Sequence, residues 1–139
     1  MSEKYRIIDH TADIGLHVFG ADPQDLFANA ALAMFDIITD SQSIETVDTL
    51  SLTVKGDDWP DLMVNWLREL LYLWTDKEKI LQEVVVSSLT PNAISAQVTL
   101  EPYDPDRHSI LNEIKAVTYH QIEVFEKDQH CEARIIFYV

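Results

Sequence analysis

The sequence is short of three things: cysteine, glycine and basic residues. Its single cysteine, Cys131, excludes an internal disulfide and a multi-cysteine zinc site, and is typical of a reducing compartment. The three glycines, Gly15, Gly20 and Gly56, are too few and too scattered for a glycine-rich phosphate loop. No apolar run approaches the ~20 residues that cross a bilayer, and the N-terminus lacks a signal-peptide pattern. We therefore expect a cytoplasmic protein without a membrane partner.

Basic residues are heavily outnumbered. Ten Lys and Arg stand against 24 Asp and Glu, which gives a formal net charge of −14 at pH 7. Because nucleic-acid affinity comes mainly from Lys and Arg that displace counterions, we expect no direct binding of RNA or DNA. A basic protein partner or cations would be attracted instead, although charge of this size also serves solubility alone.

Two segments show the spacing of amphipathic helices. The first begins with Asp22 as N-cap and Pro23 at the first helical position. The second begins after Asp57 or Asp58, with Pro60 early, and its wide apolar stripe contains Leu62, Met63, Trp66, Leu67, Leu70, Leu71 and Trp74. We expect the tryptophans of this stripe to pack in the core rather than to bind a ligand.

Alternating apolar residues predict strands at 5–8, 14–19, 46–54, 83–89, 93–100, 114–126 and 130–139. The strand at 114–126 is expected to break near Tyr119. Residues 101–113 form a polar segment with two prolines, a kind of loop that is often functional or mobile. No internal repeat is evident. Residues 1–139 are therefore expected to form a single α+β domain, with two helices packed on one face of a mostly antiparallel sheet.

A polar cluster interrupts the first two predicted strands. Asp9, His10, Thr11 and Asp13 lie within five residues, and carboxylates so placed can bind a hard cation such as Ca²⁺ or Mg²⁺. The imidazole of His10, together with His120, would suit zinc better. The alternative is structural: Asp9 and Thr11 cap turns through their side chains while His10 packs. Spacing alone favours this structural interpretation.

Two longer motifs favour a functional interpretation of this cluster instead. "DHTADIG" at 9–15 and "EIKAVTYHQIEV" at 113–124 closely resemble two motifs of the archease family, in the same order. The second helix and the chain length also fit, so the resemblance spans the whole chain. It implies an activator, not itself an enzyme, of the GTP-dependent tRNA-splicing RNA ligase. That ligase guanylylates its own active-site histidine and joins an RNA 3′-phosphate to a 5′-hydroxyl; archeases speed guanylylation and sustain turnover.

The resemblance also implies a metal site. In the family, the Asp of HTAD, a penultimate Asp and the C-terminal residue hold a metal ion, calcium. These positions correspond here to Asp13, Tyr138 and Val139. A phenol with a pKa near ~10 is a poor ligand for Ca²⁺ at pH 7, so Tyr138 is a doubtful ligand. We expect weak divalent binding or none, unless Asp9 substitutes.

Lys115 is the other residue that the resemblance marks as functional, beside Asp13 and His10 for activation of the ligase. Without the resemblance, Lys115 could equally lay its aliphatic stem along apolar surface and end in a salt bridge. Thr11 and His10 are expected to shape the turn around Asp13. His120 is expected to orient a neighbouring group rather than to bind metal.

Two other classes of function remain open at this point. One is a metal-dependent hydrolase that uses Asp9, His10, Asp13 and His120, which the scarcity of bases for holding phosphate disfavours. The other is a metal-free chaperone or modulator that acts on various partners. Cys131 lacks a local nucleophile motif, and we expect it to be a buried, inert thiol.

Overall fold

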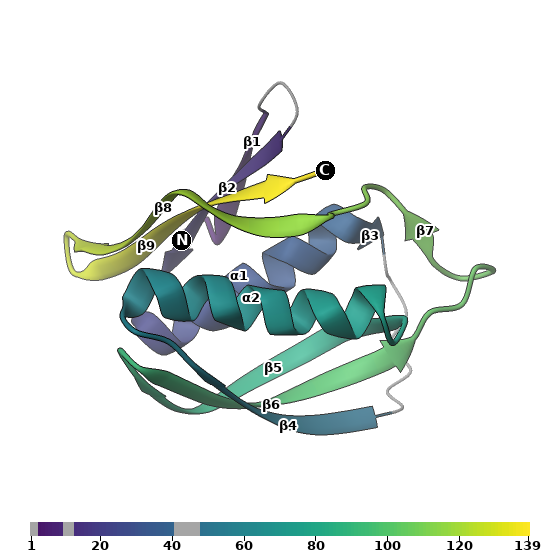
Figure 1. The fold of residues 1–139 in the computed structure, drawn as a ribbon, viewed down its shortest axis with the longest axis horizontal. Coiled ribbons are helices and arrows are strands. Elements are labelled where there is room, and N and C mark those ends of the chain that lie inside the picture. The colour runs from purple at the N-terminus through teal and green to yellow at the C-terminus, as the bar shows by residue number, and fades with distance from the viewer. Residues whose placement is uncertain (1–2, 10–12, 41–47) are drawn as a thin grey trace.

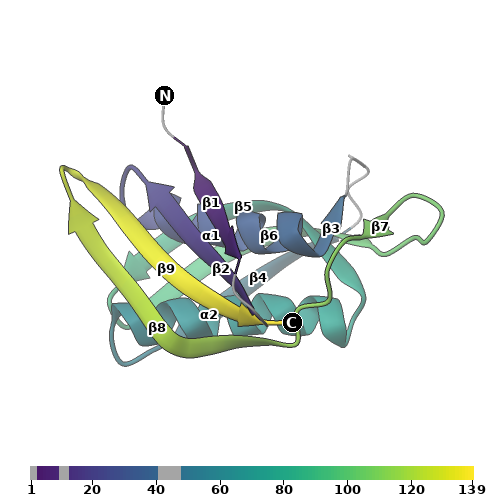
Figure 2. The ribbon, with the colours of Figure 1, turned by 90° about the horizontal axis from the view of Figure 1, so that it is seen from above.

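The structure, a computed structural model, describes residues 3–9, 13–40 and 48–139, and of residue 9 only the backbone. Helices α1 (Pro23–Ile38) and α2 (Trp59–Thr75) lie side by side in a central layer between two sheets (Figure 1). A four-stranded sheet covers one side of this layer (Figure 2), and a three-stranded sheet covers the other. Neither helix is long and apolar enough to cross a bilayer.

All paired strands in the described residues run antiparallel. The four-stranded sheet has the order β1-β2-β9-β8, with β1 at Tyr5–Asp9, β2 at Asp13–Gly20, β8 at Ala116–Lys127 and β9 at His130–Tyr138. The three-stranded sheet has the order β4-β6-β5, with β4 at Asp48–Lys55, β5 at Lys79–Thr90 and β6 at Ala93–Pro102. Two short strands, β3 at Thr39–Asp40 and β7 at Ser109–Ile110, pair with each other.

The predicted α+β class is confirmed, and the helices have a sheet on each side. Ten of the 16 residues of α1 are buried. A helix that is apolar over most of its circumference needs cover on more than one side, which a single sheet cannot supply. The start of the strand predicted at 46–54 lies outside the described residues, and its described part is β4.

Both helices begin with the same pair of reciprocal hydrogen bonds. In α1 the Asp22 carboxylate accepts the N–H of Asp25 at 2.8 Å, and the Asp25 carboxylate accepts the N–H of Ala21 at 2.8 Å. In α2, Asp58 and Asp61 form the equivalent pair. One contact of each pair satisfies a backbone N–H in the first turn, which has no partner within the helix, and the other binds the N–H of the residue before the N-cap. Both place negative charge at the positive end of the helix dipole.

A glycine precedes each of these helix starts and allows the strand to approach the helix closely. A Cβ on Gly20 would lie 2.4 Å from the Leu26 nitrogen, and one on Gly56 would lie 2.6 Å from the Leu62 nitrogen. These contacts are with backbone atoms, which cannot move aside as a flexible side chain can.

An asparagine ties each helix back to the strand before it. Asn29 donates to the Phe19 carbonyl and Asn65 donates to the Lys55 carbonyl, each at 2.9 Å. The two strand-to-helix corners repeat one construction, but they share only a glycine, two aspartates, a leucine and an asparagine, too few for detection along the chain.

Trp66 joins the two helices at the centre of the core. Its side chain is fully buried, and its indole N–H donates to the Phe27 carbonyl of α1 at 3.0 Å. Trp59 packs against the Phe27 ring, and Trp74 meets the Tyr103 ring edge to face. The prediction that Trp66 and Trp74 serve packing is confirmed.

The polar segment at 101–113 is anchored rather than open. Glu101 is fully buried and forms an ion pair with Arg107, and His108, also buried, accepts the N–H of Asp104 on its Nδ1 at 2.8 Å. Strand β7 then pairs with β3 at the end of α1. The expectation of a mobile or functional loop did not foresee these partners, because they come from elements distant in sequence.

The break predicted near Tyr119 is confirmed. The register of β8 against β9 shifts between Thr118 and Glu123, and Gln121 has a positive φ of 54° within that stretch. The strand begins at Ala116, two residues later than predicted.

Glu132 links β2 and β9 from the outer face of the four-stranded sheet. Its carboxylate accepts from His17 at 2.7 Å through one oxygen and from His130 at 2.6 Å through the other, and the residue is only 5% exposed. Burial alone would raise the pKa of Glu132, but the hydrogen bonds and charges of the two imidazoles outweigh it. The pKa therefore lies below its ordinary value of 4.5.

We expect Gly56→Ala to lower the free energy of unfolding by ~1–3 kcal/mol, because the new methyl group would force the helix backbone away from the strand. Urea denaturation measures this change. Ser51→Ala, at an exposed position of the same strand, is the matched control and should stay within ~0.5 kcal/mol. Equal effects of the two substitutions would show that the close approach at this corner is not required.

We expect Glu132→Gln to lower stability at pH 6–7 by about 1.5–3 kcal/mol, since it removes a buried carboxylate with two imidazole donors. A lowered carboxyl pKa stabilises the fold above the ordinary value of 4.5, and this contribution is lost as pH falls through the lowered pKa. The gap between variant and wild type should therefore narrow below pH 4.5 in urea denaturation. A gap that stays constant from pH 7 to pH 3, as expected for the exposed control Glu123→Gln, would contradict this account.

Candidate functional site

Asp13 and Tyr138 face each other at one end of the four-stranded sheet. Asp13 begins β2, Tyr138 ends β9, and the two are direct register partners. Directly opposed residues of an antiparallel pair place their side chains on the same face, within reach of each other. Asp13 is half-buried and Tyr138 is 48% exposed. The pair therefore lies at an accessible end of the two inner strands, next to Val139.

Lys115 lies beside this pair, although it is about a hundred residues from Asp13 in sequence. Its backbone N–H donates to the Tyr138 carbonyl at 2.7 Å, and its Nζ lies 5.8 Å from the centre of the Tyr138 ring. The side chain is exposed and forms a salt bridge with none of the described carboxylates. The two motifs of the sequence thus meet at one place, and the lysine ends over an aromatic ring rather than in an ion pair.

The structure says less about the other residues singled out in the sequence than about Asp13, Lys115 and Tyr138. His10 and Thr11 lie outside the described residues. The backbone of Asp9 pairs with Ile14 in β1, and its side chain is not described. His120 is exposed in the irregular part of β8, where its backbone N–H donates to the Thr118 hydroxyl at 3.3 Å.

The described residues do not by themselves make a complete calcium site. They offer the Asp13 carboxylate, while at its register partner Tyr138 stands a phenol with the Lys115 ammonium near its ring. Ca²⁺ takes 6–8 oxygen ligands and prefers charged ones, so this donor set is poor. Among residues 3–8, 13–40 and 48–139, no group of three or more His, Cys, Asp or Glu side chains could hold a metal ion.

Sequence reasoning missed a set of tyrosines and cations that lie close to one another around a hollow between α2 and the start of β8. We name it the cation–tyrosine face; its members are Arg68, Tyr72, Lys77, Lys115, Tyr119 and Tyr138. Each cation lies near one ring, and the Arg68 guanidinium is 4.7 Å from the centre of the Tyr119 ring. No local pattern could have revealed this face, because its members come from α2 and the residues after it, from β8 and the residue before it, and from β9.

Hydrogen bonding within this face shifts two pKa values in opposite directions. The Tyr119 hydroxyl donates to the Asp61 carboxylate at 2.7 Å. This bond, together with hydrogen bonds from the Asp57 backbone N–H and the Asn65 side chain, lowers the pKa of Asp61, and the charge of Arg68 adds a smaller effect. The same bond raises the pKa of Tyr119. Tyr119 is therefore held as a neutral donor with its ring presented to solvent.

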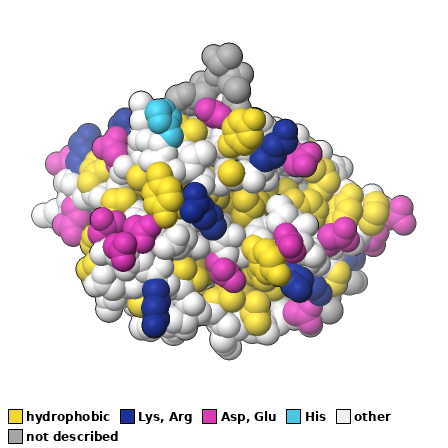
Figure 3. Space-filling view, viewed as in Figure 1, with side chains coloured by type: hydrophobic (Ala, Val, Ile, Leu, Met, Phe, Trp, Pro, Cys, Tyr) yellow, Lys and Arg dark blue, Asp and Glu magenta, His cyan; other side chains and the backbone are white. Residues whose placement is uncertain are grey.

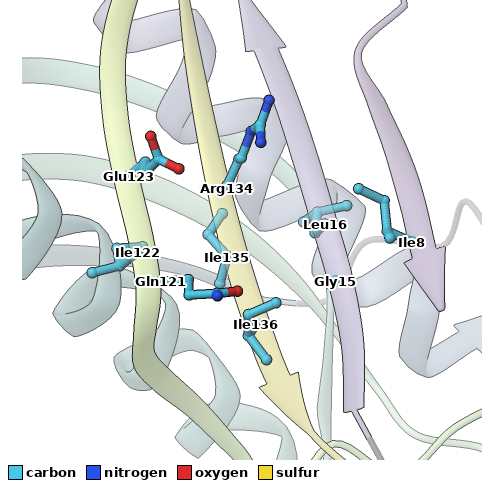
Figure 4. A pocket seen from close by; sticks show the side chains of 9 residues that line it. All are labelled: Ile8, Gly15, Leu16, Gln121, Ile122, Glu123, Arg134, Ile135 and Ile136. Atoms are coloured by element: carbon cyan, nitrogen blue, oxygen red, sulfur yellow. The ribbon is translucent and has the colours of Figure 1, made fainter. Parts of the chain in front are cut away.

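A hollow of about 380 Å³ opens on the outer face of the four-stranded sheet, which the helices do not cover (Figure 4). Gly15 and Ile136 form its floor as register partners, and Arg134 and Glu123 stand at one end of it. Gly15 is two residues from Asp13, so the hollow and Asp13 share one face of the sheet. This face is thus accessible to a partner.

Cys131 is 6% exposed, and burial raises the pKa of its thiol. The reactive form of cysteine is the thiolate, which a raised pKa disfavours. The expected buried, inert thiol agrees with this environment.

Comparison with known proteins agrees with this architecture. The chain matches the archease protein family (MTH1598/TM1083) over residues 5–139. It is 36% identical over 138 residues to the protein archease of Methanosarcina barkeri, covering 96% of this chain and 94% of the relative. The protein archease of Methanopyrus kandleri is 35% identical over 124 residues, covering 87% and 89% of the two chains.

Two solved structures share the fold. The solution structure of Methanobacterium thermoautotrophicum protein 1598 superposes with a TM-score of 0.81 at 29% identity, covering 98% of this chain and 99% of the other. The crystal structure of a Thermotoga maritima archease, described as a possible chaperone, gives a TM-score of 0.61 at 16% identity over the full length of both chains. The described fold and the match across nearly the whole sequence lead to one conclusion: this chain belongs to the archease family.

Proposed function

We propose that this protein acts in the cytoplasm as an activator of the GTP-dependent tRNA-splicing RNA ligase, promoting guanylylation and multiple turnover. One observation carries most weight. Lys115 and Asp13, from motifs far apart in sequence, lie at one accessible end of the four-stranded sheet. A lysine without a described carboxylate partner contributes little to folding there, whereas it is available to a second protein.

The charge of the chain supports a protein partner. With a net charge of −14, the molecule would be steered toward a basic RNA-binding cleft and away from free RNA. An activator shifts its partner only by the difference in its affinity for the partner's two states. Under this proposal, Lys115 and Asp13 contact the ligase in its guanylylation-competent state more favourably than in the resting state.

The name of one relative points the same way at a coarser level. The Thermotoga maritima archease is described as a possible chaperone, which is a protein that assists another protein. Activation of an enzyme is one form of such assistance, and it is the form that the paired motifs favour.

We expect substoichiometric amounts of the wild-type protein to accelerate guanylylation and multiple-turnover joining by its cognate ligase. Lys115→Ala and Asp13→Ala should reduce this activation strongly while changing the unfolding free energy by no more than ~0.5 kcal/mol for the exposed lysine. Lys127→Ala, an exposed lysine at the far end of β8, is the matched control and should activate normally.

Two outcomes would contradict this proposal. A ligase that is active alone but gains nothing from the wild-type protein would remove the assigned function. Loss of activation that merely follows loss of thermal stability in both variants would assign Lys115 and Asp13 a structural role.

We further propose that divalent binding at Asp13 and Val139 is weak in this protein because Tyr138 supplies no charge. The Asp13–Tyr138 register places a substituted carboxylate directly opposite the first one. Tyr138→Asp should therefore tighten Ca²⁺ binding, and Asp13→Asn should weaken it, as measured by calorimetry.

Tyr72→Asp is the matched control for calcium, since it adds the same charge to an exposed tyrosine on α2. It should leave Ca²⁺ binding unchanged. Wild-type binding as tight as that of Tyr138→Asp would show that the penultimate carboxylate is dispensable in this chain.

A further inference from the structure

The cation–tyrosine face differs from the rest of this acidic molecule. Its three tyrosines, Tyr72, Tyr119 and Tyr138, are 44%, 47% and 48% exposed. Each has a Lys or Arg within 5.8 Å of its ring centre. Tyrosine and arginine are the side chains that protein interfaces use most for binding energy. Arg68, Tyr72 and Lys115 line one hollow, and each of the other members pairs with one of them through a ring. Figure 3 shows basic side chains next to hydrophobic ones on the side of the molecule that carries α2 and β8, with acidic side chains among them.

A hollow of about 340 Å³ lies within this face, and both Arg68 and Lys115 line it. Buried apolar side chains contribute to its lining, which consists of Arg68, Leu71, Tyr72, Thr75, Lys115, Ala116 and Val117. The hollow therefore has both apolar side chains and two cations, Arg68 and Lys115, in its lining.

Arg68 is held in place by the fold. Its Nε donates to the Val117 carbonyl at 3.1 Å, and its guanidinium stacks over Tyr119. The two terminal nitrogens of the guanidinium make no hydrogen bond to the described residues. An arginine positioned by one hydrogen bond and one ring keeps its remaining donors for a planar anion such as a carboxylate.

The charges around the hollow indicate which chemical group of a partner could bind in it. Arg68 and Lys115 form no salt bridge within the described residues, although the charge of Arg68 interacts with the Asp61 carboxylate that the Tyr119 hydroxyl binds. A cation that is covered by a partner needs an anion to offset the loss of water, so an occupant of the hollow should carry a carboxylate. A nucleic acid would supply phosphate instead, but the net charge of −14 repels its backbone.

We propose that the cation–tyrosine face is the surface through which this protein docks on its ligase. The hollow lined by Arg68 and Lys115 takes an Asp or Glu side chain of the ligase that has an apolar neighbour. Tyr72 and Tyr119 flank this contact and exclude water from it. The inference rests on the proposed function, since it takes the ligase as the partner, and it adds the contact surface and the chemistry that the ligase presents there.

The central test compares two charge reversals that change the net charge equally. Arg68→Glu alters the hollow, whereas Lys127→Glu alters an exposed lysine at the far end of β8. We expect Arg68→Glu to raise the dissociation constant for the purified cognate ligase by at least about tenfold, as buried interface arginines do. Lys127→Glu should stay within about twofold, because only the shared long-range charge effect remains. Calorimetry measures binding, and guanylylation is assayed separately in the same samples.

A second variant separates docking from folding. Arg68→Glu also removes the hydrogen bond to Val117, so its melting temperature must be compared with that of the wild type. Tyr72→Ser removes an exposed ring that holds no position in the core, and it should weaken binding without lowering the melting temperature. Reversal of the matching ligase carboxylate to lysine should restore the binding of Arg68→Glu.

The outcomes distinguish this inference from the proposed function. Normal binding by both face variants, with a wild-type protein that binds and activates, would overturn the docking surface and leave the function standing. Weakened binding by both variants, with a wild type that binds without activating, would support the surface and overturn the function. A wild type that neither binds nor activates the ligase would overturn both.

Discussion

The arrangement of this molecule depends on two close strand-to-helix corners. At each corner a glycine lets the strand approach the helix backbone, an aspartate pair closes the helix start, and an asparagine ties the helix to the strand behind it. These contacts determine where α1 and α2 begin relative to β2 and β4. Because the corners are short and built from backbone contacts, they leave little freedom in the placement of the helices between the sheets.

The candidate functional surface follows from that placement. With α2 held by its corner and by the Trp66 hydrogen bond to α1, the middle of α2 packs against β8. Arg68 can then reach the Val117 carbonyl, and Lys115 can lie over Tyr138 at the end of β9. The exposed side chains of this region are therefore attached to a helix and strands that pack tightly together. This suits a surface that must present several side chains at once.

The distribution of charge is as important as its total. Acidic residues give the whole molecule a net charge of −14, which acts over long distances and favours encounter with basic surfaces. The cation–tyrosine face acts at short range and offers the opposite charge with aromatic surface. A long-range field of one sign and a local contact of the other can together make association fast and still specific.

The helices, the core tryptophans and most strands could be predicted because local signals determine them. Asp22 and Asp58 mark helix starts through hydrogen bonds within a few residues, and alternation along β6 reports its buried face directly. The division of the strands into two sheets could not be predicted, since pairing partners come from distant parts of the chain. The short β3–β7 pair was missed for the same reason.

The candidate site shows the same division. The sequence by itself determined that Asp13 and Lys115 belong to two unusual motifs, that Tyr138 interrupts the expected set of carboxylates, and that the chain is strongly acidic. Only the tertiary structure decided that Asp13 faces Tyr138, that Lys115 lies over the same ring, and that Arg68 and Lys115 line one hollow. The physical reason is that residue identity and local propensity are encoded along the chain. The meeting of α2, β8 and β9 depends instead on how the helices pack between two sheets.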